Sequence, residues 1–521
     1  MRNVAARCLV TACVVIVWLA LPRHGQPSQA LPSAHHASET PVLAPDEPQD
    51  GLEPILPVRD PDPLPPGTGQ RNPPLDFSHL VTDRLPEGVQ ATILADWDWR
   101  NRGIVTPVHN QGSCGSCYAF ASLASLESRI LFQGGGAVDL SENNLKECNY
   151  YENYDIKDGG VPWGGCHGAN AWLTANHLSQ YGAVLESCDP YVDGDVACRT
   201  TCTPSKTLLG MRVISDGGVP NPDVLKAALQ SYGPLYVSLY VGDNDRWAQE
   251  FQRYDGSYVL YYAGAQVTNH GVLLVGYDDS KPHAGGQGAW IVKNSWGTDW
   301  GGPCGFGSTG GYFYIAYGSA RFGERAAAFQ EWQNADPNCR LLYHDEAGAN
   351  RRLGFGAQKQ AWALAHYTAP VTGLVSRIEW WAHDATADMD LYLYSSFDGQ
   401  TLGSRLWQQE NLSYPEAGYF SVAVSPPVAV QAGQAIVAVM HMQSISLPKP
   451  LPADVLGPVA AGRTYMSDTG ANGSWIDTGA AYQAEVGLRV RLCAQVPPSP
   501  TPTPTATSSP TATRTPTTAG R

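Results

Sequence analysis

The sequence predicts a two-lobed α+β domain followed by an all-β sandwich domain. Helix-like runs come first in the chain and strand-like runs come after them, which is typical of an α+β fold with segregated lobes. A second pattern begins near Cys339, where short strand-like runs are separated by Gly, Asp, Pro and Asn and no long helix-like run appears. Such a pattern favours a sandwich of two sheets.

The three helix-like runs carry ordinary start and stop signals. Residues 117–132 are rich in Ala and Leu, with apolar residues nearly all round, so we expect a buried helix. The run at 168–182 ends at Gly182. The run at 221–233 has a proline in its first turn and a glycine at its end, which are the usual boundary residues of a helix.

Strand-like runs rich in β-branched and aromatic residues follow these helices. In the first domain they cover 234–241, 270–278, 289–296 and 311–317. In the second domain they cover 376–384, 389–396, 419–425, 434–442 and 486–493. We expect the second domain to fold on its own, with its tryptophans in the core rather than stacked on sugars. These tryptophans are Trp380, Trp381, Trp407 and Trp475.

Composition divides the chain into five parts. Arg2 and Arg7 precede a short apolar run with small residues after it, which is typical of a signal peptide. The segment after it is rich in Pro and acidic residues and shows no apolar periodicity. The parts are a signal peptide (1–30), a Pro-rich leader or pro-region (31–90), the α+β domain (91–330), the sandwich (336–494) and a low-complexity Pro/Thr-rich tail (495–521).

We expect a secreted protein, either free or associated with the cell surface. The residues before Cys13 resemble a lipoprotein site, but the apolar run continues beyond that cysteine. No other run is long and apolar enough to span a membrane. The exported chain would therefore enter an oxidising compartment, where disulfides form.

Charge excludes one class of partner. The 521-residue chain has a formal net charge of −15, and only 16% of its residues are charged. A nucleic-acid partner is therefore not expected, because phosphate binding requires a basic face. The acidity is interpreted as a contribution to solubility.

The stretch "NQGSCGSCYAF" places Cys114 and Cys117 three residues apart, a spacing used by redox pairs, by zinc sites and by a thiol nucleophile beside a structural cysteine. A zinc site would need Cys198 and Cys202 as well. Ten cysteines remain after the signal peptide. If one is a nucleophile, a second must also stay unpaired or pair with another chain.

Residues elsewhere in the sequence favour the nucleophile. His270 begins a strand-like run and could take the thiol proton from Cys117, while the carbonyl of Asn294 could fix the imidazole tautomer. Gln111 offers an amide N–H that could join the Cys117 N–H in holding an oxyanion. Cys117 also opens a helix-like run, where the helix dipole and free N–H groups favour a thiolate.

At these residues the chain resembles the papain family of cysteine peptidases. The motifs are "QGSCGSCYAF", "LSENNL", "GGCHGANAW", "NHGVLLVGYD" and "KNSWGTDWG", in the family's order and at its approximate spacing. The resemblance covers roughly residues 90 to 320. It implies a papain-like fold with a helical lobe and a β-barrel-like lobe.

The resemblance also implies a role for each matching residue. Cys117 would be the nucleophile, His270 the acid/base, Asn294 the orienting amide and Gln111 the oxyanion donor. Trp296 would shield the His–Asn hydrogen bond and, with Gly168 and Ala169, line the substrate site. Cys114 would pair with Cys166, and Cys339 could tie the sandwich's ends together by pairing with Cys493. No cofactor and no metal is implied.

Three features depart from the family pattern. Tyr118 stands where Trp is usual, so the pKa of the neighbouring thiol could change. Ala169 replaces a glycine in the strip that pairs with substrate backbone. A short Pro-rich leader stands in place of a long helical propeptide, and we expect this leader to keep the enzyme latent until it is cut between about Pro74 and Asp96.

Residues 336–494 resemble the lectin-like β-sandwich that follows papain-like domains in some secreted bacterial peptidases. This domain could bind a glycan or another cell-surface ligand, although the resemblance alone does not establish sugar binding. Calcium could use the carboxylates of Asp384, Asp388, Asp390 and Asp398. We interpret them instead as solvated acids, and His109, His167, His177 and His283 as surface or satisfied histidines.

The sequence therefore predicts a secreted cysteine endopeptidase that acts on protein or peptide substrates. Two alternatives remain open. The first is an adhesive or surface-binding protein whose papain-like domain is inert. The second is a transpeptidase, in which an amine rather than water resolves the same acyl-enzyme.

Overall fold

The computed structural model describes residue 52 and residues 64–75, 77–80, 93–153, 157–158 and 161–494. The predicted signal peptide, most of the leader and the Pro/Thr-rich tail lie outside the described residues. The expected processing stretch, Pro74 to Asp96, lies only partly within them. Among the described residues, no helix combines the length and the apolar character needed to cross a membrane.

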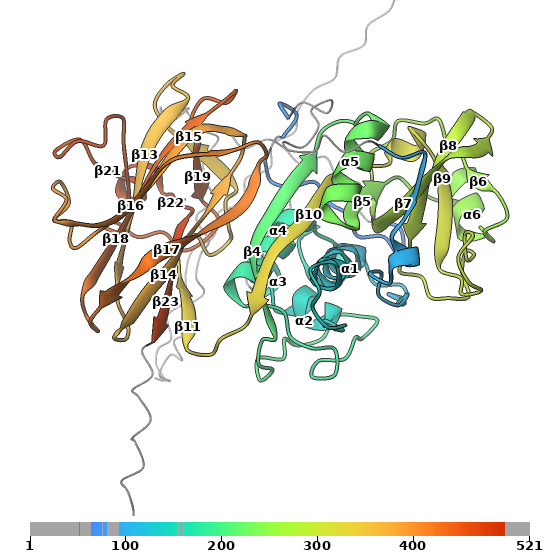
Figure 1. Ribbon diagram of the computed structural model, residues 1–521, viewed down its shortest axis with the longest axis horizontal. Coiled ribbons are helices and arrows are strands. Elements are labelled where there is room, and N and C mark those ends of the chain that lie inside the picture. Colours follow the sequence, from blue (N-terminus) through green and yellow to red (C-terminus); the bar gives the residue numbers. More distant parts are fainter. Residues whose placement is uncertain are drawn as a thin grey trace, which may run out of the picture. The chain divides into compact units, whose positions relative to one another are not determined.

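The first lobe is built from helices packed around a shared apolar core (Figure 1). The long helix predicted at residues 117–132 is confirmed and is buried on almost every side. The helices of this lobe are α1 (Cys117–Phe132), α2 (Glu142–Glu147), α3 (Tyr150–Asn153) and α4 (Ala171–Gln180). Short pieces beside them are η2 (Gly165–His167), β2 (Lys157–Asp158) and β3 (Val161–Pro162).

Helix α4 begins three residues later than the sequence pattern predicts. Its N-cap is Asn170, whose side chain accepts a hydrogen bond from the Leu173 N–H at 3.0 Å. Gly168 lies before this cap with φ +94°, a left-handed region that glycine adopts without steric cost. Gly168 and Ala169 therefore stay outside the helix; the Gly168 carbonyl accepts from the Gly164 N–H at 3.0 Å, and the Ala169 backbone groups can bind another chain segment.

The second lobe is strand-rich and has its own core. Its sheet is formed by antiparallel neighbours except for one parallel pair, β6 with β9. Its strands are β1 (Asp96–Asp98), β4 (Lys206–Ser215), β5 (Leu235–Leu239), β6 (Val259–Leu260), β7 (His270–His283), β8 (Gly286–Lys293), β9 (Tyr312–Ala316) and β10 (Ala326–Asn334). Its helical elements are η1 (Trp99–Arg102), α5 (Pro222–Tyr232), α6 (Arg246–Gln252) and η3 (Ser319–Arg321).

The C-terminal domain is an all-β sandwich, as the sequence predicts. Its core fills the space between the sheets and contains Trp380 and Trp407, while Trp381 and Trp475 are also buried. The strands are β11 (Cys339–Leu342), β12 (Arg351–Leu353), β13 (Gln360–Thr368), β14 (Gly373–Ala382), β15 (Thr386–Tyr394), β16 (Arg405–Tyr414), β17 (Gly418–Val430), β18 (Ala435–Ser444), β19 (Leu451–Asp454), β20 (Thr464–Ser467), β21 (Ile476–Asp477), β22 (Glu485–Val486) and β23 (Leu488–Ala494), with one short helix, α7 (Thr478–Tyr482).

The sandwich is joined to the first domain by a continuous sheet, which does not support the expectation that it folds alone. Strand β17 pairs with β4, so one 12-stranded sheet passes through both domains. Trp172 of α4 packs on Trp381 of β14 with ring centroids 4.3 Å apart. Arg489 is fully buried, binds Asp345 at 2.7 Å and donates to Asn176 of α4 at 2.6 Å.

Four disulfides fasten the described chain. Two of them, Cys114–Cys166 and Cys339–Cys493, are the pairs that the sequence analysis expected. The other two are Cys148–Cys198 and Cys188–Cys202. Cys117 and Cys304 are free and buried, which gives one unpaired cysteine besides the expected nucleophile.

Candidate active site

Cys117 lies at the junction of the two lobes, where it is the first residue of α1. Its thiol is completely buried, and its sulfur accepts a hydrogen bond from the Gly271 N–H at 3.1 Å. Gly271 follows His270 on β7, so the start of a helix in one lobe meets the start of a strand in the other. As the first helical residue, Cys117 has an N–H without a partner inside the helix, and this N–H is available to an oxyanion.

His270 and Asn294 form a buried hydrogen-bonded pair. His270 Nε2 lies 2.8 Å from Asn294 Oδ1. A side-chain carbonyl only accepts, so Nε2 carries the proton and Nδ1 has a free lone pair. Nδ1 has no hydrogen-bond partner among the described residues. The imidazole is therefore held in the tautomer that can accept a thiol proton at Nδ1.

Trp296 covers this pair. Its ring centroid lies 5.2 Å from that of His270, at an interplanar angle of 40°. Strand β8 ends at Lys293, so Asn294 and Trp296 lie in the loop after it rather than in the strand that the sequence predicted. The loop turns the Asn294 carbonyl toward His270 and places the indole over the hydrogen bond.

The Gln111 side chain is fully buried, and its amide lies against the Cys114 backbone, three residues before Cys117. Its Nε2 donates to the Cys114 carbonyl at 2.8 Å, and its Oε1 accepts from the Ser295 hydroxyl at 2.5 Å. These two contacts fix the rotation of the amide. Nε2 has a second N–H, which is left for a ligand beside Cys117.

Leader residues 64–75, which we call the leader segment, lie in the cleft above Cys117. The Ala169 N–H donates to the Gly69 carbonyl and the Ala169 carbonyl accepts from the Arg71 N–H, both at 2.9 Å. These contacts make a parallel bridge between Gln70 and Ala169. The Trp296 indole N–H also donates to the Gly67 carbonyl at 3.0 Å. The leader segment therefore uses the backbone groups that the sequence analysis assigned to substrate.

Gly69 lies where the leader segment leaves no room for a side chain. A Cβ atom at this position would lie 1.8 Å from the Gly115 carbonyl oxygen, which is too close for any side chain to fit there. The Gly69 N–H donates a hydrogen bond to the Asn269 carbonyl at 3.1 Å, so this residue of the leader is held on both sides of the cleft.

Burial beneath the leader segment keeps the thiol and the imidazole neutral. It raises the pKa of Cys117 to about 12, although N–H groups of Gly271, Tyr118 and Gly69 act in the opposite direction. Burial lowers the pKa of His270 to about 4, opposed by the hydrogen bond to Asn294. At neutral pH the covered site therefore holds a thiol and an imidazole rather than a thiolate and an imidazolium.

Tyr118, the residue that departs from the family's tryptophan, is buried within the helical lobe. Its hydroxyl donates to the Gly165 carbonyl at 3.1 Å. Gly165 precedes Cys166, so the tyrosine supports the loop that the Cys114–Cys166 disulfide also holds. The substitution therefore keeps an aromatic ring in the core and adds one hydrogen bond.

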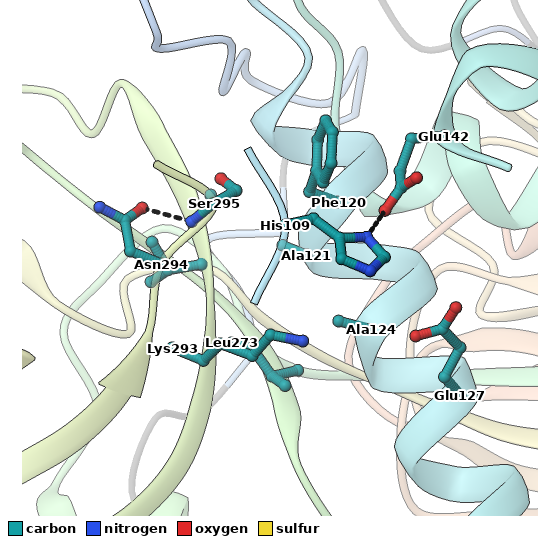
Figure 2. Close-up of a pocket in the computed structure, with 12 residues that line it drawn as sticks. His109, Phe120, Ala121, Ala124, Glu127, Glu142, Leu273, Lys293, Asn294 and Ser295 are labelled. Carbon is teal, nitrogen blue, oxygen red and sulfur yellow. Dashed lines mark hydrogen bonds and ion pairs between the residues drawn. The ribbon is translucent and has the colours of Figure 1, made fainter. Parts of the chain in front are cut away.

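A small charged cavity lies beneath the cleft, between α1 and β8 (Figure 2). Its volume is ≈ 20 Å³, enough for about one water molecule. The Lys293 amine and the Glu127 carboxylate both hydrogen-bond Thr106, at 3.2 and 2.8 Å. Burial raises the pKa of Glu127 and lowers that of Lys293. Because Lys293 directly precedes Asn294, this cluster holds the end of β8 from which the Asn294 loop begins.

Sequence reasoning gave no role to this cluster. Its one candidate there, His109, is a satisfied histidine that hydrogen-bonds Glu142 at 3.0 Å. Glu142 lies in the motif "LSENNL" and Lys293 lies in the motif "KNSWGTDWG". Because both motifs were already assigned to the neighbourhood of the site, they could have pointed to these two charged residues. A buried lysine and a buried glutamate cannot be recognised from composition alone.

The acidic residues of the sandwich are used in different ways. The interpretation of Asp384 as a solvated acid was wrong, because it is buried and accepts hydrogen bonds from the Ser446 and Leu447 N–H groups, so it fixes a loop. Ligand atoms of Asp388, Asp390 and His441 lie within 4.8 Å of one another. The four aspartates that the sequence offered therefore do not converge on one point.

Comparison with known proteins agrees with this fold. Residues 93–328 match the papain family cysteine protease domain, and residues 341–490 match a lectin like domain. The chain thus matches a papain-family cysteine protease domain and then a lectin-like domain, in the order that the sequence predicts.

Individual relatives match the first domain. Mouse cathepsin K is 35% identical over 237 residues, which are 45% of this chain and 65% of that protein. Cysteine proteinase 2 of Entamoeba histolytica is 36% identical over 214 residues, which are 39% of this chain and 60% of that protein. The chain therefore spans less than two thirds of the length of these curated relatives.

One solved structure contains both domains. It holds the cysteine protease and lectin-like domains of Cwp84, a surface layer associated protein of Clostridium difficile. The TM-score is 0.66 and the identity 16%, over 86% of this chain and 100% of that one. At this identity the likeness concerns the fold, and it shows that the order of the two domains also occurs elsewhere.

Proposed function

We propose that the protein is a secreted cysteine endopeptidase that its own leader segment keeps latent. The observation that carries this proposal is the convergence of four side chains at one junction. The Cys117 sulfur contacts Gly271, the residue after His270, and Asn294 fixes the imidazole of His270. The Gln111 amide donates one N–H to the Cys114 carbonyl and keeps its second N–H for a ligand. This set provides a nucleophile, a base, an orienting group and an oxyanion donor.

The first half of the reaction forms a thioester. Cys117 Sγ–H transfers its proton to His270 Nδ1, and the sulfur attacks the carbonyl carbon of the peptide bond. The C=O electron pair moves to oxygen, where the N–H groups of Cys117 and Gln111 stabilise the negative charge. When the carbonyl re-forms, the C–N bond breaks and His270 gives its proton to the leaving amine.

The second half releases the acyl group. Water loses a proton to His270 Nδ1 as its oxygen attacks the thioester carbon, and the same N–H groups stabilise the second oxyanion. The C–S bond then breaks, the product leaves as a carboxylic acid, and the proton on His270 returns to the sulfur. Asn294 keeps the imidazole oriented through both halves, and no step needs a metal or a cofactor.

Latency follows from occupation of the cleft. The leader segment holds the Ala169 backbone groups and the Trp296 indole, so a substrate chain cannot bind until the leader segment leaves. Burial by the leader segment also disfavours the charged thiolate. Cleavage of the leader between about Pro74 and Asp96 would therefore activate the enzyme.

The four disulfides support export to an oxidising compartment. Cwp84 is a surface layer associated protein, and its likeness to this chain supports a cell-surface location as one form of this export. Protein or peptide chains are the proposed substrates, and the lectin-like domain is proposed to bind a glycan or another surface ligand.

The experiment compares the leader-free protein with its Cys117→Ala variant on unfolded casein. The leader-free protein should cleave casein, the variant should not, and a chelator should leave cleavage unchanged. His270→Ala should also abolish turnover, while Asn294→Ala should retain part of it because Asn294 orients rather than reacts. Full activity in Cys117→Ala would contradict the proposal.

A further inference from the structure

The Gln70 side chain of the leader segment is completely buried in a pocket beside the cleft. Its Oε1 accepts a hydrogen bond from the Tyr236 hydroxyl, and its Nε2 donates to the Arg71 carbonyl at 2.6 Å. Gln70 is also the residue that forms the bridge with Ala169. The pocket therefore lies at the level of the backbone groups that would bind substrate.

The pocket has apolar walls and a polar end. A cavity of ≈ 30 Å³ remains beside the Gln70 side chain, and Pro73 and Phe77 of the leader close it on one side. The apolar walls come from α4, β4 and β10, and the polar end comes from Tyr236 with an ion pair. The lining residues from the enzyme include Trp172, Met211, Asp216, Tyr236, Arg325 and Ala327.

The polar end already contains one guanidinium and two carboxylates. Arg325 Nε lies 3.4 Å from an Asp216 carboxylate oxygen, and Arg325 Nη1 lies 3.7 Å from a Glu324 carboxylate oxygen. Arg325 Nη1 also donates to the Thr268 hydroxyl at 2.7 Å. A further carboxylate would meet two like charges, and a further ammonium would meet the guanidinium.

Tyr236 is therefore the donor that a substrate side chain would meet. Its ring is buried on β5, and burial raises the pKa of the phenol well above its ordinary value. The hydroxyl stays protonated over the physiological pH range and can donate a hydrogen bond. An apolar side chain in this position would leave the buried hydroxyl without an acceptor, which is unfavourable.

We propose that this pocket selects a glutamine side chain in the substrate, at the residue whose backbone pairs with Ala169. The Tyr236 hydroxyl donates a hydrogen bond to the side-chain carbonyl of that glutamine. The inference rests on the proposed function and assigns a substrate class to the same site. Glutamine reaches the hydroxyl without adding charge, and its methylene groups contact the apolar walls. Glutamate is disfavoured by Asp216 and Glu324, and leucine is disfavoured by the unpaired hydroxyl.

The first test measures cleavage of a peptide library by the leader-free protein, with mass spectrometry of the products. Peptides with glutamine at the selected position should be cleaved with a kcat/KM about tenfold above that of peptides with leucine or glutamate, the usual scale of one hydrogen bond. Tyr236→Phe should remove this preference, because it lowers the kcat/KM of glutamine peptides, which lose their donor, and raises that of leucine peptides, which no longer leave a hydroxyl unpaired. Tyr277→Phe is the matched control, because its hydroxyl bonds Gln230 and Leu94 instead.

The second test measures binding without turnover. A peptide of residues 64–75 is titrated into leader-free Cys117→Ala protein, and the same is done with the Gln70→Met peptide. The Gln70→Met peptide should bind about tenfold more weakly. The two peptides should bind equally once Tyr236→Phe is added, because the two changes remove the same hydrogen bond.

The outcomes separate the two proposals. A cleavage preference for apolar or charged side chains at this position, or a glutamine preference that survives Tyr236→Phe, would overturn the assignment of the pocket. A protein that binds the leader peptide through Tyr236 but cleaves no peptide would overturn the proposed function, and with it the substrate assignment.

Discussion

Gln111 shows how single residues set the chemistry of the cleft. Its amide is fixed by the Cys114 carbonyl and by the Ser295 hydroxyl, so its free N–H has a defined direction. We predict that Gln111→Ala in the leader-free protein lowers kcat by on the order of 100-fold, the usual effect of losing one oxyanion donor. Kinetics on a peptide substrate would measure this.

The matched control is Ser295→Ala. It removes the contact to Oε1 but leaves the Cys114 contact and the free N–H, so its kcat should fall much less than that of Gln111→Ala. An unchanged kcat in Gln111→Ala would show that the amide does not reach the oxyanion.

The leader segment is the element on which latency depends. Gly69 lies so close to Gly115 that an added methyl group would collide with the Gly115 carbonyl. We predict that Gly69→Ala dislodges the leader segment and gives a full-length protein that cleaves a peptide reporter without processing. The rate should approach that of the leader-free protein, because the catalytic residues are unchanged.

Gly136→Ala controls for a general effect of replacing glycine. A Cβ atom at Gly136 would meet open space, and its backbone lies outside the left-handed region. Gly136→Ala should therefore stay latent. A latent Gly69→Ala protein would mean that the leader segment tolerates the methyl group and does not depend on this contact.

The whole molecule is held together by contacts that cross between the two domains. Asp345 and Arg489 form a fully buried ion pair in the sandwich, and Arg489 also bonds Asn176 and Ser179 of α4. We predict that Asp345→Ala destabilises the protein by about 3–5 kcal/mol, because Arg489 is left as an unpaired buried charge. Thermal or denaturant unfolding would measure the loss.

The double variant Asp345→Ala/Arg489→Met is the informative comparison. It removes both charges and should recover a large part of the lost stability. If Asp345→Ala alone has no effect, the ion pair is open to water and the domain junction is looser than the structure shows.

The leader also contacts both domains, and acid should weaken one of these contacts. His79 lies 2.9 Å from the His383 carbonyl and 3.7 Å from Asp384. Burial lowers the pKa of His383 well below its ordinary value, and Arg352 and His79 lower it further. In the unfolded chain this histidine is protonated below about pH 6.5, whereas the folded protein keeps it neutral. Protonation therefore favours the unfolded chain, and the protein loses stability as the pH falls below that value.

His383→Phe keeps the ring and removes this titration. We predict that its stability relative to the wild-type protein rises as the pH falls, by at most about 1.4 kcal/mol for each pH unit below about 6.5. Burial raises the pKa of Glu485 to about 7, so Glu485→Gln should show a pH dependence of opposite sign. If the difference in stability between His383→Phe and the wild-type protein does not change with pH, the lowered pKa assigned to His383 is contradicted.

The sequence predicted a candidate catalytic set because each member belongs to a motif with a specific chemical role. The structure brings Cys117, His270, Asn294 and Gln111 together at one junction. The place of the leader segment could not be predicted, since a Pro- and Gly-rich stretch has no apolar periodicity and many of its contacts with the cleft use backbone groups. The junction between domains was also missed, because β17 and β4 pair through only two residue pairs, Gly418 with Arg212 and Tyr419 with Met211.

The reactivity of Cys117 before and after removal of the leader tests the central claim most directly. A thiol-directed epoxide is added at neutral pH to the full-length and to the leader-free protein, and the labelled residue is identified by mass spectrometry. The account predicts one label on Cys117 in the leader-free protein, almost none in the full-length protein, and none on the buried Cys304 in either. Equal labelling of Cys117 in both proteins would contradict the claim that the leader segment covers the nucleophile, and no labelling of Cys117 in the leader-free protein would contradict its role as nucleophile.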